Sequence, residues 1–237
     1  MQQSGYLELD EVLTRIEHAL STHQALSLVR IGDGENLVLA QDTVWPIDQV
    51  LQERWAMKAN RGQKGLFLPN LKLRDEVASS VQRANIVGIL PYNDISINAP
   101  SYLKRELTDQ VFSHFGISPL LTCHACLNRQ LVSTPMFWNM LKNQRLLIVT
   151  REDLQVKSVL ESPPYTLQIS HTIPFGQYEQ MSETLRWIVD HKSEFDVALF
   201  TCGVNAVVLA ERTATLTGKV AFDFGKASNI LINGRAN

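Results

Sequence analysis

The sequence predicts an α/β fold, a mainly parallel, Rossmann-like sheet of about seven strands with helices on both faces. Short apolar runs alternate with longer amphipathic segments along nearly the whole chain. The runs are too uniformly apolar for strands with one face in water, as expected of a parallel sheet covered on both faces. No repeat, low-complexity tract or change of composition interrupts the pattern, so we expect residues 1–237 to form a single domain.

The first part of the chain predicts one strand among three helices. Apolar residues in the segment 6–20 recur at the i, i+3, i+4, i+7 spacing of one helical face. The apolar run 26–31 predicts a buried strand, and helix-compatible sequence follows at 36–41. Trp45-Pro46 is expected to end that helix, because proline disfavours helical geometry in the residue before it. Residues 47–60 are expected to form the third helix.

The middle of the chain opens with a basic loop between glycines, Arg61-Gly62-Gln63-Lys64-Gly65. We expect this loop to be either a solvated turn or a flexible loop that contacts phosphate. Helix and strand then alternate regularly. The elements are a helix at 71–83, a strand at 86–90, a helix at 101–115 with Ser101 as its N-cap candidate, a strand at 120–123 and a helix at 128–142.

The last part of the chain continues the alternation to a final strand. Pro163-Pro164 is expected to stop the helix that Asp153 could cap. The elements are a strand at 146–150, a helix at 153–161, a strand at 167–174, a helix at 177–192, a strand at 197–202, a helix at 204–216 and a strand at 220–224.

Charge and hydropathy exclude several kinds of partner. The formal net charge is −2, and the basic residues are scattered, so no electrostatic footprint for nucleic acid or an anionic membrane surface exists. No apolar stretch reaches the about 18 residues of a transmembrane helix, and Met1–Gly5 does not start like a signal peptide. We therefore expect a cytoplasmic protein. The oligomeric state stays open, a homo-oligomer included.

The three cysteines include a C-x-x-C motif, Cys123-His124-Ala125-Cys126. A zinc site would need the fold to bring Cys202 and His171 to this motif, since no second pair of ligands has the usual spacing. A redox role would need a thiol with a lowered pKa. The interpretation that we favour is that the cysteines are small buried hydrophobes in a reducing compartment.

Two carboxylates follow the first predicted strand. The apolar run breaks at Gly32, and Asp33 and Glu35 come next with Gly34 between them. Parallel sheets bind ligands at the carboxyl ends of their strands. Two carboxylates suit Mg²⁺ or Mn²⁺, which leaves the rest of its coordination to water and substrate phosphate. The glycines would permit positive φ and let a phosphate approach. The alternative is an ordinary surface turn.

The residues just past each predicted strand are expected to meet at one rim of the sheet. They are Asp33 and Glu35; Tyr92, Asn93 and Asp94; His124, Asn128 and Arg129; Arg151; His171 and Thr172; Gly203 and Asn205; and Asp223 and Gly225. This set is rich in metal ligands, phosphate donors and bases. The P-loop, G-x-G-x-x-G, H-E-x-x-H and G-x-S-x-G motifs are all absent, which argues against P-loop enzymes, dinucleotide dehydrogenases, zincins and α/β-hydrolases.

Several rim residues have two interpretations. Gly203-Val204-Asn205-Ala206 enters a helix and could hold a phosphate on free N–H groups, or could simply pack tightly. Arg30 is either a phosphate clamp or the ion-pair partner of a carboxylate. Asp94 and His124 are candidate general bases, although a single histidine is often structural. Asp223 is either hydrogen-bonded structure or a wall of the site.

Val29-Arg30-Ile31-Gly32-Asp33-Gly34-Glu35 resembles the Arg-aromatic-Gly-Asp-Gly-Glu stretch of the GT-D class of glycosyltransferases, with Ile31 in place of the aromatic residue. Later segments resemble that family in the same order, so the similarity covers most of residues 24–230. These segments are 122–141, which contains Asn128-Arg129; 169–178; 200–210; and 218–225.

The resemblance implies a transferase that depends on Mn²⁺ or Mg²⁺ and moves a sugar from a nucleoside diphosphate sugar, UDP-linked, to an acceptor. Asp33 and Glu35 match the motif that holds the metal. The donor would be bound by Arg30, Gly32, Gly34, Asn128, Arg129, Gly203, Asn205 and Asp223. If the anomeric centre inverts, Asp94 or His124 would deprotonate the acceptor hydroxyl. The acceptor, whether glycan, lipid-linked or protein, stays open.

Two alternatives remain. The same fold could serve as a nucleotide-sugar-binding or assembly module without turnover, because a fold does not establish an activity. The turn at Gly32 also imitates the glycine-rich loop of S-adenosylmethionine methyltransferases. That fold needs an acidic residue at the end of a second strand, whereas Gln52-Glu53-Arg54-Trp55 lies in a predicted helix.

Overall fold

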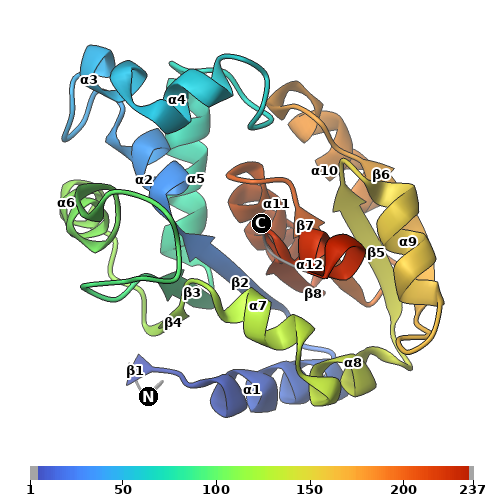
Figure 1. Cartoon of the computed structure of the whole chain (residues 1–237). Helices are drawn as coiled ribbons and strands as arrows, with labels where there is room; N and C mark the ends of the chain where they lie inside the picture. Colours follow the sequence, from blue (N-terminus) through green and yellow to red (C-terminus); the bar gives the residue numbers. More distant parts are fainter. Residues whose placement is uncertain (1–4, 235–237) are drawn as a thin grey trace.

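Eight strands form one sheet, and helices cover both of its faces (Figure 1). The computed structural model describes residues 5–234. The strands are β1 (Gly5–Tyr6), β2 (Leu26–Ile31), β3 (Ile86–Ile89), β4 (Leu121–His124), β5 (Arg145–Thr150), β6 (Gln168–Pro174), β7 (Val197–Thr201) and β8 (Val220–Asp223). Their order across the sheet is β1-β4-β3-β2-β8-β7-β5-β6, and every neighbouring pair is parallel. The predicted α/β fold is confirmed.

The helices match the predicted segments, with a few divisions. They are α1 (Leu9–Ser21), α2 (Asp33–Ala40), α3 (Ile47–Gln52), α4 (Arg54–Ala59), α5 (Leu71–Arg83), α6 (Arg105–Phe115), α7 (Leu127–Val132), α8 (Pro135–Leu141), α9 (Asp153–Glu161), α10 (Met181–Asp190), α11 (Asn205–Thr217) and α12 (Ala227–Asn233), with 3₁₀ turns η1 (Ser101–Leu103) and η2 (Tyr178–Gln180). The sequence missed β1 and α12. It also joined α3 with α4 and α7 with α8.

The prediction that Trp45-Pro46 ends the second helix was wrong. That helix, α2, ends at Ala40, because Gln41 leaves the helical region with a ψ of 117°. The Gln41 side chain is buried, donates to the carbonyl of Val38 and accepts from the Asn70 N–H. A long-range contact therefore ends the helix before the proline does. No described helix is long and apolar enough to cross a membrane.

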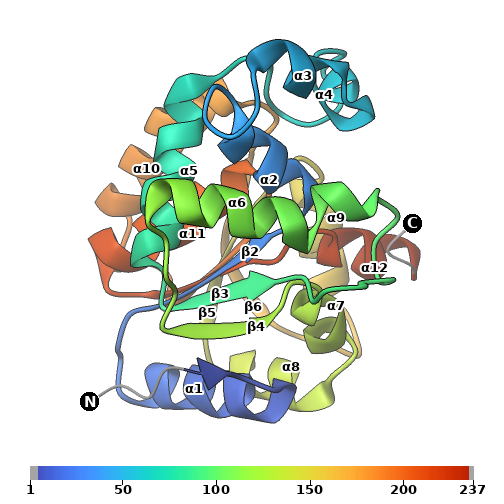
Figure 2. The same ribbon diagram turned by 90° about the vertical axis from the view of Figure 1, so that its left-hand side faces the viewer.

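Each face of the sheet is covered by connections that run in one direction along it. The helices of the connections that lead toward β1 share one core, built on α2, α5, α6, α10 and α11. The connections that lead toward β6 contain α1, α7, α8 and α9. These four helices share the other core with α12 (Figures 1 and 2). This sorting is expected when all crossovers have the same hand.

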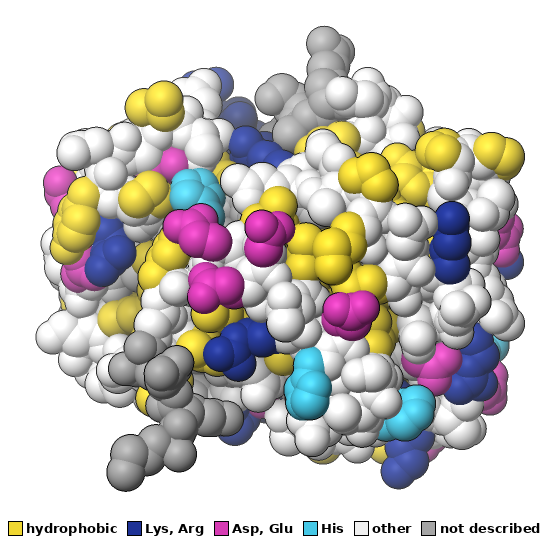
Figure 3. All heavy atoms as spheres, turned by 90° about the horizontal axis from the view of Figure 1, so that it is seen from below, with side chains coloured by type: hydrophobic (Ala, Val, Ile, Leu, Met, Phe, Trp, Pro, Cys, Tyr) yellow, Lys and Arg dark blue, Asp and Glu magenta, His cyan; other side chains and the backbone are white. Residues whose placement is uncertain are grey.

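The sorting of the connections opens a crevice at the carboxyl edge of the sheet. β2 and β8 are neighbours, but α2 leaves β2 toward one face and α12 follows β8 on the other. Ligands of open α/β sheets bind where the connections diverge in this way. On the face seen from below, by contrast, acidic, basic and apolar side chains are mixed without a large patch of one charge (Figure 3).

Candidate active site

A cavity of about 880 Å³ lies over the carboxyl ends of the strands. Its lining comes from the segments that follow seven of the eight strands, every strand except β1. Of the residues predicted to form the site, those in the lining are Arg30, Gly32, Asp33, Gly34, Glu35, Asp94, Asn128, Arg129 and Gly203. His124, Asn205 and Asp223 are not in the lining. The structure thus gathers most of the predicted rim around one space.

The two acidic residues occupy the first turn of α2 rather than a loop. Glu35 Oε2 accepts a hydrogen bond of 2.9 Å from the Gly32 N–H, which caps the helix. The Asp33 carboxylate lines the cavity and has no hydrogen-bond or ion-pair partner within residues 5–234. The positive end of the helix dipole favours negative charge at this position. Both carboxylate oxygens of Asp33 are therefore available to a ligand in the cavity.

The glycines of this turn are needed for space and not for positive φ, contrary to our expectation. Gly32 has a φ of −120°, and Gly34 is not among the residues with positive φ. A Cβ atom on Gly34 would lie 2.5 Å from a ring carbon of Trp55. Gly34 thus lets the indole of Trp55, which also lines the cavity, pack against α2.

Burial raises the pKa of Glu35 to about 7. The nearby carboxylates of Asp223 and Asp33 act in the same direction, and the guanidinium of Arg30 opposes them. One oxygen of Asp223, Oδ2, is buried without a hydrogen-bond partner among the described residues. The floor of the cavity therefore holds more negative charge than the single Arg30 compensates.

Arg30 is a structural arginine. Its Nε and Nη2 donate to the carbonyl and to Oδ1 of Asp223, at 2.9 and 2.8 Å. Nη1 donates at 3.2 Å both to the Ala125 carbonyl and to Oδ1 of Asn128. These bonds occupy nearly all of the guanidinium's N–H groups. Of the two interpretations of Arg30, the structure shows the ion pair, and the partner is Asp223.

Asn128 and Gly225 complete this scaffold. Asn128 is buried, and its Nδ2 donates to the Phe224 carbonyl at 2.8 Å while its Oδ1 accepts from Arg30. A Cβ atom on Gly225, whose φ is +49°, would lie 1.9 Å from Nη2 of Arg30. The polar groups of Arg30, Asn128 and Asp223 thus join β2, β8 and α7, which leaves them little capacity to bind a ligand.

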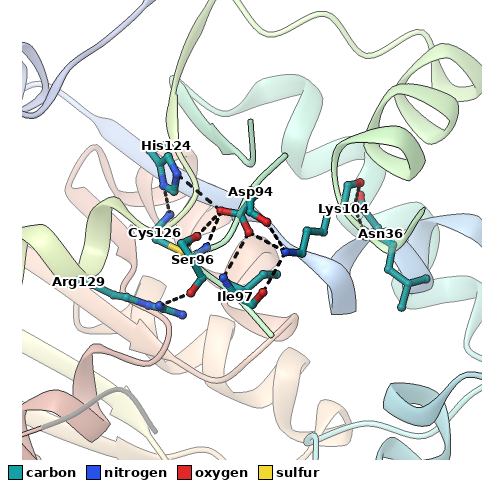
Figure 4. Close-up of polar contacts among 9 residues, drawn as sticks. Asn36, Asp94, Ser96, Ile97, Lys104, His124, Cys126 and Arg129 are labelled. Atoms are coloured by element: carbon teal, nitrogen blue, oxygen red, sulfur yellow. Dashed lines mark hydrogen bonds and ion pairs between the residues drawn. The ribbon is translucent and has the colours of Figure 1, made fainter. Parts of the chain in front are cut away.

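Asp94 is held by several donors (Figure 4). Its Oδ1 accepts from the hydroxyl and the N–H of Ser96, and Oδ2 accepts from Lys104 Nζ at 3.0 Å and from the Ile97 N–H at 3.3 Å. Burial alone would raise the pKa of Asp94, but these hydrogen bonds outweigh it and lower the pKa to about 2. A carboxylate so engaged anchors a loop and is a weak proton acceptor, so the geometry does not favour Asp94 as a general base.

His124 lies behind Asp94, outside the lining of the cavity. Its Nδ1 accepts from the Cys126 N–H at 3.0 Å, and its Nε2 lies 3.9 Å from Asp94 Oδ1. The interaction with Cys126 raises the pKa of His124, aided by Asp94, although burial and Arg129 oppose it. With both ring nitrogens directed at protein groups, His124 is poorly placed to receive a proton from an acceptor.

The basic loop 61–65 lies at the cavity, as one of its two interpretations predicted, with Gln63, Lys64 and Gly65 in the lining. The Gly65 carbonyl accepts from the Tyr178 N–H and from Asn205 Nδ2, both at 2.9 Å. Asn205 therefore fixes this loop to the start of α11 and is buried beneath it. Gly203, with a φ of +61°, makes the turn into α11 and stays exposed to the cavity.

The zinc interpretation of the C-x-x-C motif has no support, because no group of three His, Cys, Asp or Glu side chains among residues 5–234 could hold a metal. The three cysteines are unbonded to one another and buried. The expected place of His171 at the rim was wrong, because β6 continues past it to Pro174. His171 Nε2 instead lies 2.6 Å from Glu194 Oε2.

Residues that the sequence analysis did not single out also shape the site. Trp55 and Phe175 give the cavity apolar walls, and Lys226 lies at its edge. Lys104 is buried and joins Asp94 to α2, because its carbonyl accepts from Asn36 Nδ2 at 2.9 Å. No local pattern marks these residues, since each acts through contacts with segments that are distant in the sequence.

Comparison with known proteins agrees with the architecture. The family described as a GT-D fold-like domain matches residues 7–231. A solved structure of the domain of unknown function 1792, described as having a distinct glycosyltransferase fold, is 15% identical with a TM-score of 0.63 and covers 99% of this chain and 84% of that chain. A selenomethionine-substituted structure of domain 1792 is 17% identical with a TM-score of 0.59, over 96% and 80% of the two chains. No curated protein matches this chain.

The resemblance found in the sequence is thus confirmed at the level of family and fold. The methyltransferase alternative gains no support. The segment that would have to end a second strand in that fold lies at the junction of α3 and α4.

Proposed function

Because the chain belongs to the GT-D-like family, we propose that it is a metal-dependent glycosyltransferase that moves a sugar from a nucleoside diphosphate sugar to an acceptor hydroxyl. The preference for a UDP-linked donor is carried over from the resemblance in sequence. The observation that carries the proposal is the Asp33 carboxylate, which starts α2 at the cavity and has no partner within residues 5–234. The unpaired cysteines suit a reducing compartment such as the cytosol.

The residues at this turn fit Mg²⁺ or Mn²⁺. These ions are commonly held by one or two carboxylates, and water and substrate phosphates complete the coordination. Asp33 offers both of its oxygens, and Glu35 offers the one that does not cap α2. Asp33 and Glu35 would hold the ion, which supplies positive charge to the departing nucleoside diphosphate. The shortage of positive charge around Glu35 agrees with such an occupant.

We call residues 32–35, which carry Asp33 and Glu35, the acidic turn. Protein groups near the acidic turn are suited to hold the diphosphate. Lys64 and Lys226 both line the cavity, and burial, together with the charge of Lys226, lowers the pKa of Lys64. The N–H groups of Gly203 and Val204, at the start of α11, have no partner within residues 5–234. A helix of 13 residues begins there, so its dipole favours an anion. These groups would stabilise the charge that grows on the leaving group.

The acceptor hydroxyl must lose its proton during the transfer. Since Asp94 and His124 are engaged by protein groups, we assign this role to Glu152, which follows β5 and lines the cavity. Glu152 has no ion-pair partner within residues 5–234, and its one hydrogen bond, from Thr150, is 3.4 Å long. It is therefore the most available carboxylate of the cavity outside the acidic turn.

The acidic turn is tested by Asp33→Asn and Glu35→Gln. We expect each substitution to weaken the binding of UDP in the presence of Mn²⁺ at least tenfold and to lower UDP-sugar turnover at least a hundredfold, as measured by calorimetry and by UDP release. Asp48→Asn is the matched control, because Asp48 is also in the first turn of a helix but is exposed and outside the cavity. Undiminished turnover in both variants, with the fold intact, would remove the proposal.

A nucleotide-sugar-binding module without turnover is the second candidate. The engagement of Asp94 by its neighbours favours it, because a predicted base is thereby lost. Glu152→Gln separates the two functions. In a transferase it should leave UDP affinity within about twofold and lower turnover at least a hundredfold. Tight UDP-sugar binding without hydrolysis or transfer in the unaltered protein would favour the binding module.

A further inference from the structure

Arg129 is a further cationic group in the cavity, in addition to the lysines near the acidic turn. It belongs to α7 and lines the cavity. Its Nη1 donates to the Ser96 carbonyl at 2.8 Å. Within residues 5–234 no carboxylate pairs with its guanidinium, so most of its N–H groups and its charge are unsatisfied by the protein. A partly buried cation without a counter-ion is costly unless a ligand supplies one.

The neighbours of Arg129 do not neutralise it. Asp94, which accepts from Ser96 of the same loop, is paired with Lys104 at 3.0 Å. His124 stands beside Asp94, with its Nε2 3.9 Å from Asp94 Oδ1, and its Nδ1 accepts from the Cys126 N–H, so the ring brings no negative charge to Arg129. We call Arg129, His124 and Cys126 the Arg129 corner. Its positive charge is that of Arg129, which lines the cavity together with Cys126, and His124 lies beside them.

The Arg129 guanidinium is also held in place. Ser96, whose carbonyl binds it, lies in a loop that Asp94 closes by accepting from the N–H groups of Ser96 and Ile97. Lys104 donates to the Ile97 carbonyl at 2.9 Å, and its own carbonyl is bound by Asn36 of α2 (Figure 4). An arginine fixed in this way has already lost its side-chain freedom, so it binds an anion at a lower entropic cost. Its planar fork suits a phosphate or a carboxylate.

The diphosphate of the donor has other groups to bind it. The charged groups that act on Lys64 are Lys226, Asp33, Lys58 and Glu35. Arg129 instead donates to the Ser96 carbonyl, and the titratable groups on which its charge acts are His124 and Cys126. The acidic turn and the Arg129 corner thus have different neighbours within one cavity.

We propose that the Arg129 corner binds an anionic group, a phosphate ester or a carboxylate, on the acceptor. The proposal rests on the proposed function, which gives the acidic turn to the donor. It defines the acceptor as a negatively charged molecule and assigns Arg129 to the acceptor, rather than to the donor as the sequence predicted.

The test uses protein saturated with UDP and Mg²⁺, so that the donor site is filled. Phenyl phosphate, benzoate and phenol are then titrated in by calorimetry. We expect at least one of the two anions to bind and phenol to bind at least tenfold more weakly. Arg129→Gln should weaken the binding of that anion at least tenfold and leave UDP affinity within about twofold, and Arg129→Lys should restore part of the loss. Phenyl phosphate and benzoate distinguish a phosphate acceptor from a carboxylate acceptor.

Arg151→Gln is the matched control, because Arg151 also lines the cavity but donates to the Gly176 carbonyl at 3.1 Å, near the end of β6. It should leave the binding of the anion within about twofold. The inference is overturned if neither anion binds, or if Arg129→Gln weakens UDP as much as the anion. If UDP does not bind the unaltered protein, the proposed function fails. Titration of the anions into protein without UDP, with the same variants, then still tests whether the Arg129 corner binds an anion.

Discussion

Asp33 and Asp94 occupy similar places and have opposite surroundings. Each follows a central strand, β2 or β3, and each lines the same cavity. Asp33 has no partner within residues 5–234, whereas Asp94 accepts hydrogen bonds from Ser96, Ile97 and Lys104. A carboxylate at the carboxyl edge of a parallel sheet is therefore not by itself a ligand-binding group. The hydrogen-bond donors that the rest of the fold brings to the carboxylate decide whether it can bind a ligand or stabilises the structure.

The largest effect on stability should come from the buried Arg30–Asp223 pair. Arg30→Met leaves the fully buried Asp223 carboxylate without its cation, which should lower the free energy of unfolding by about 4 kcal/mol. Arg145→Met, at the partly exposed Arg145–Asp196 pair, is the control and should cost less than about 1 kcal/mol. Urea unfolding measures both. Equal losses would show that the buried pair is no more structural than the exposed one.

Asp94→Asn should have the next largest effect. The amide keeps the shape of the side chain but loses the charge-assisted bond to Lys104, so the free energy of unfolding should fall by about 2 kcal/mol. Lys104→Met, read by the same unfolding experiment, should cost a similar amount, and the double variant should cost less than the sum. Strict additivity would mean that the two side chains do not act as a pair.

The contribution of Asp94 to the free energy of unfolding should depend on pH. Its pKa of about 2 lies below the ordinary 3.8, so the folded state binds this proton less readily than the unfolded chain. The contribution is complete above the ordinary pKa and disappears as the pH falls through about 2. The stability advantage of the unaltered protein over Asp94→Asn should therefore shrink between about pH 5 and about pH 2. An advantage that is constant over this interval would contradict the low pKa.

Asp33→Asn should have the smallest effect on stability. Because no group within residues 5–234 pairs with this carboxylate, the free energy of unfolding should change by no more than about 0.5 kcal/mol. Thermal unfolding of Asp33→Asn beside Asp94→Asn gives the direct comparison. A loss as large as that of Asp94→Asn would mean that both aspartates serve the structure, and the contrast between them would be lost.

The fold could be predicted from the sequence because its signals are local. Most of the strands β2 to β8 are short apolar runs, and a covered parallel sheet explains runs that are apolar on both faces. The exception is β6, an edge strand in which polar and apolar residues are mixed. β1 has only two residues, and its hydrogen bonds go to β4, more than a hundred residues away, so no local pattern marks it. The division between α7 and α8 follows from Pro135, which the apolar periodicity conceals.

The site could be predicted in part, because composition shows which residues lie at the rim but not what they touch. The sequence places Arg30, Asn128 and Asp223 at the rim. Their mutual hydrogen bonds, which span up to 193 residues, turn these candidate ligands into a scaffold. The pairing of Asp94 with Lys104 is closer in sequence, but it depends on the irregular loop between them. Partner choice is a property of the assembled fold.

The Gly65 carbonyl, which accepts hydrogen bonds from Tyr178 and Asn205, limits how the cavity can open. These bonds attach the segment that bears Lys64 to η2, which follows β6, and to α11, which follows β7, so that side of the entrance moves with the sheet. Hydrogen exchange at the Tyr178 N–H, which donates to the Gly65 carbonyl, should accordingly be slow compared with the N–H groups of the remaining surface loops.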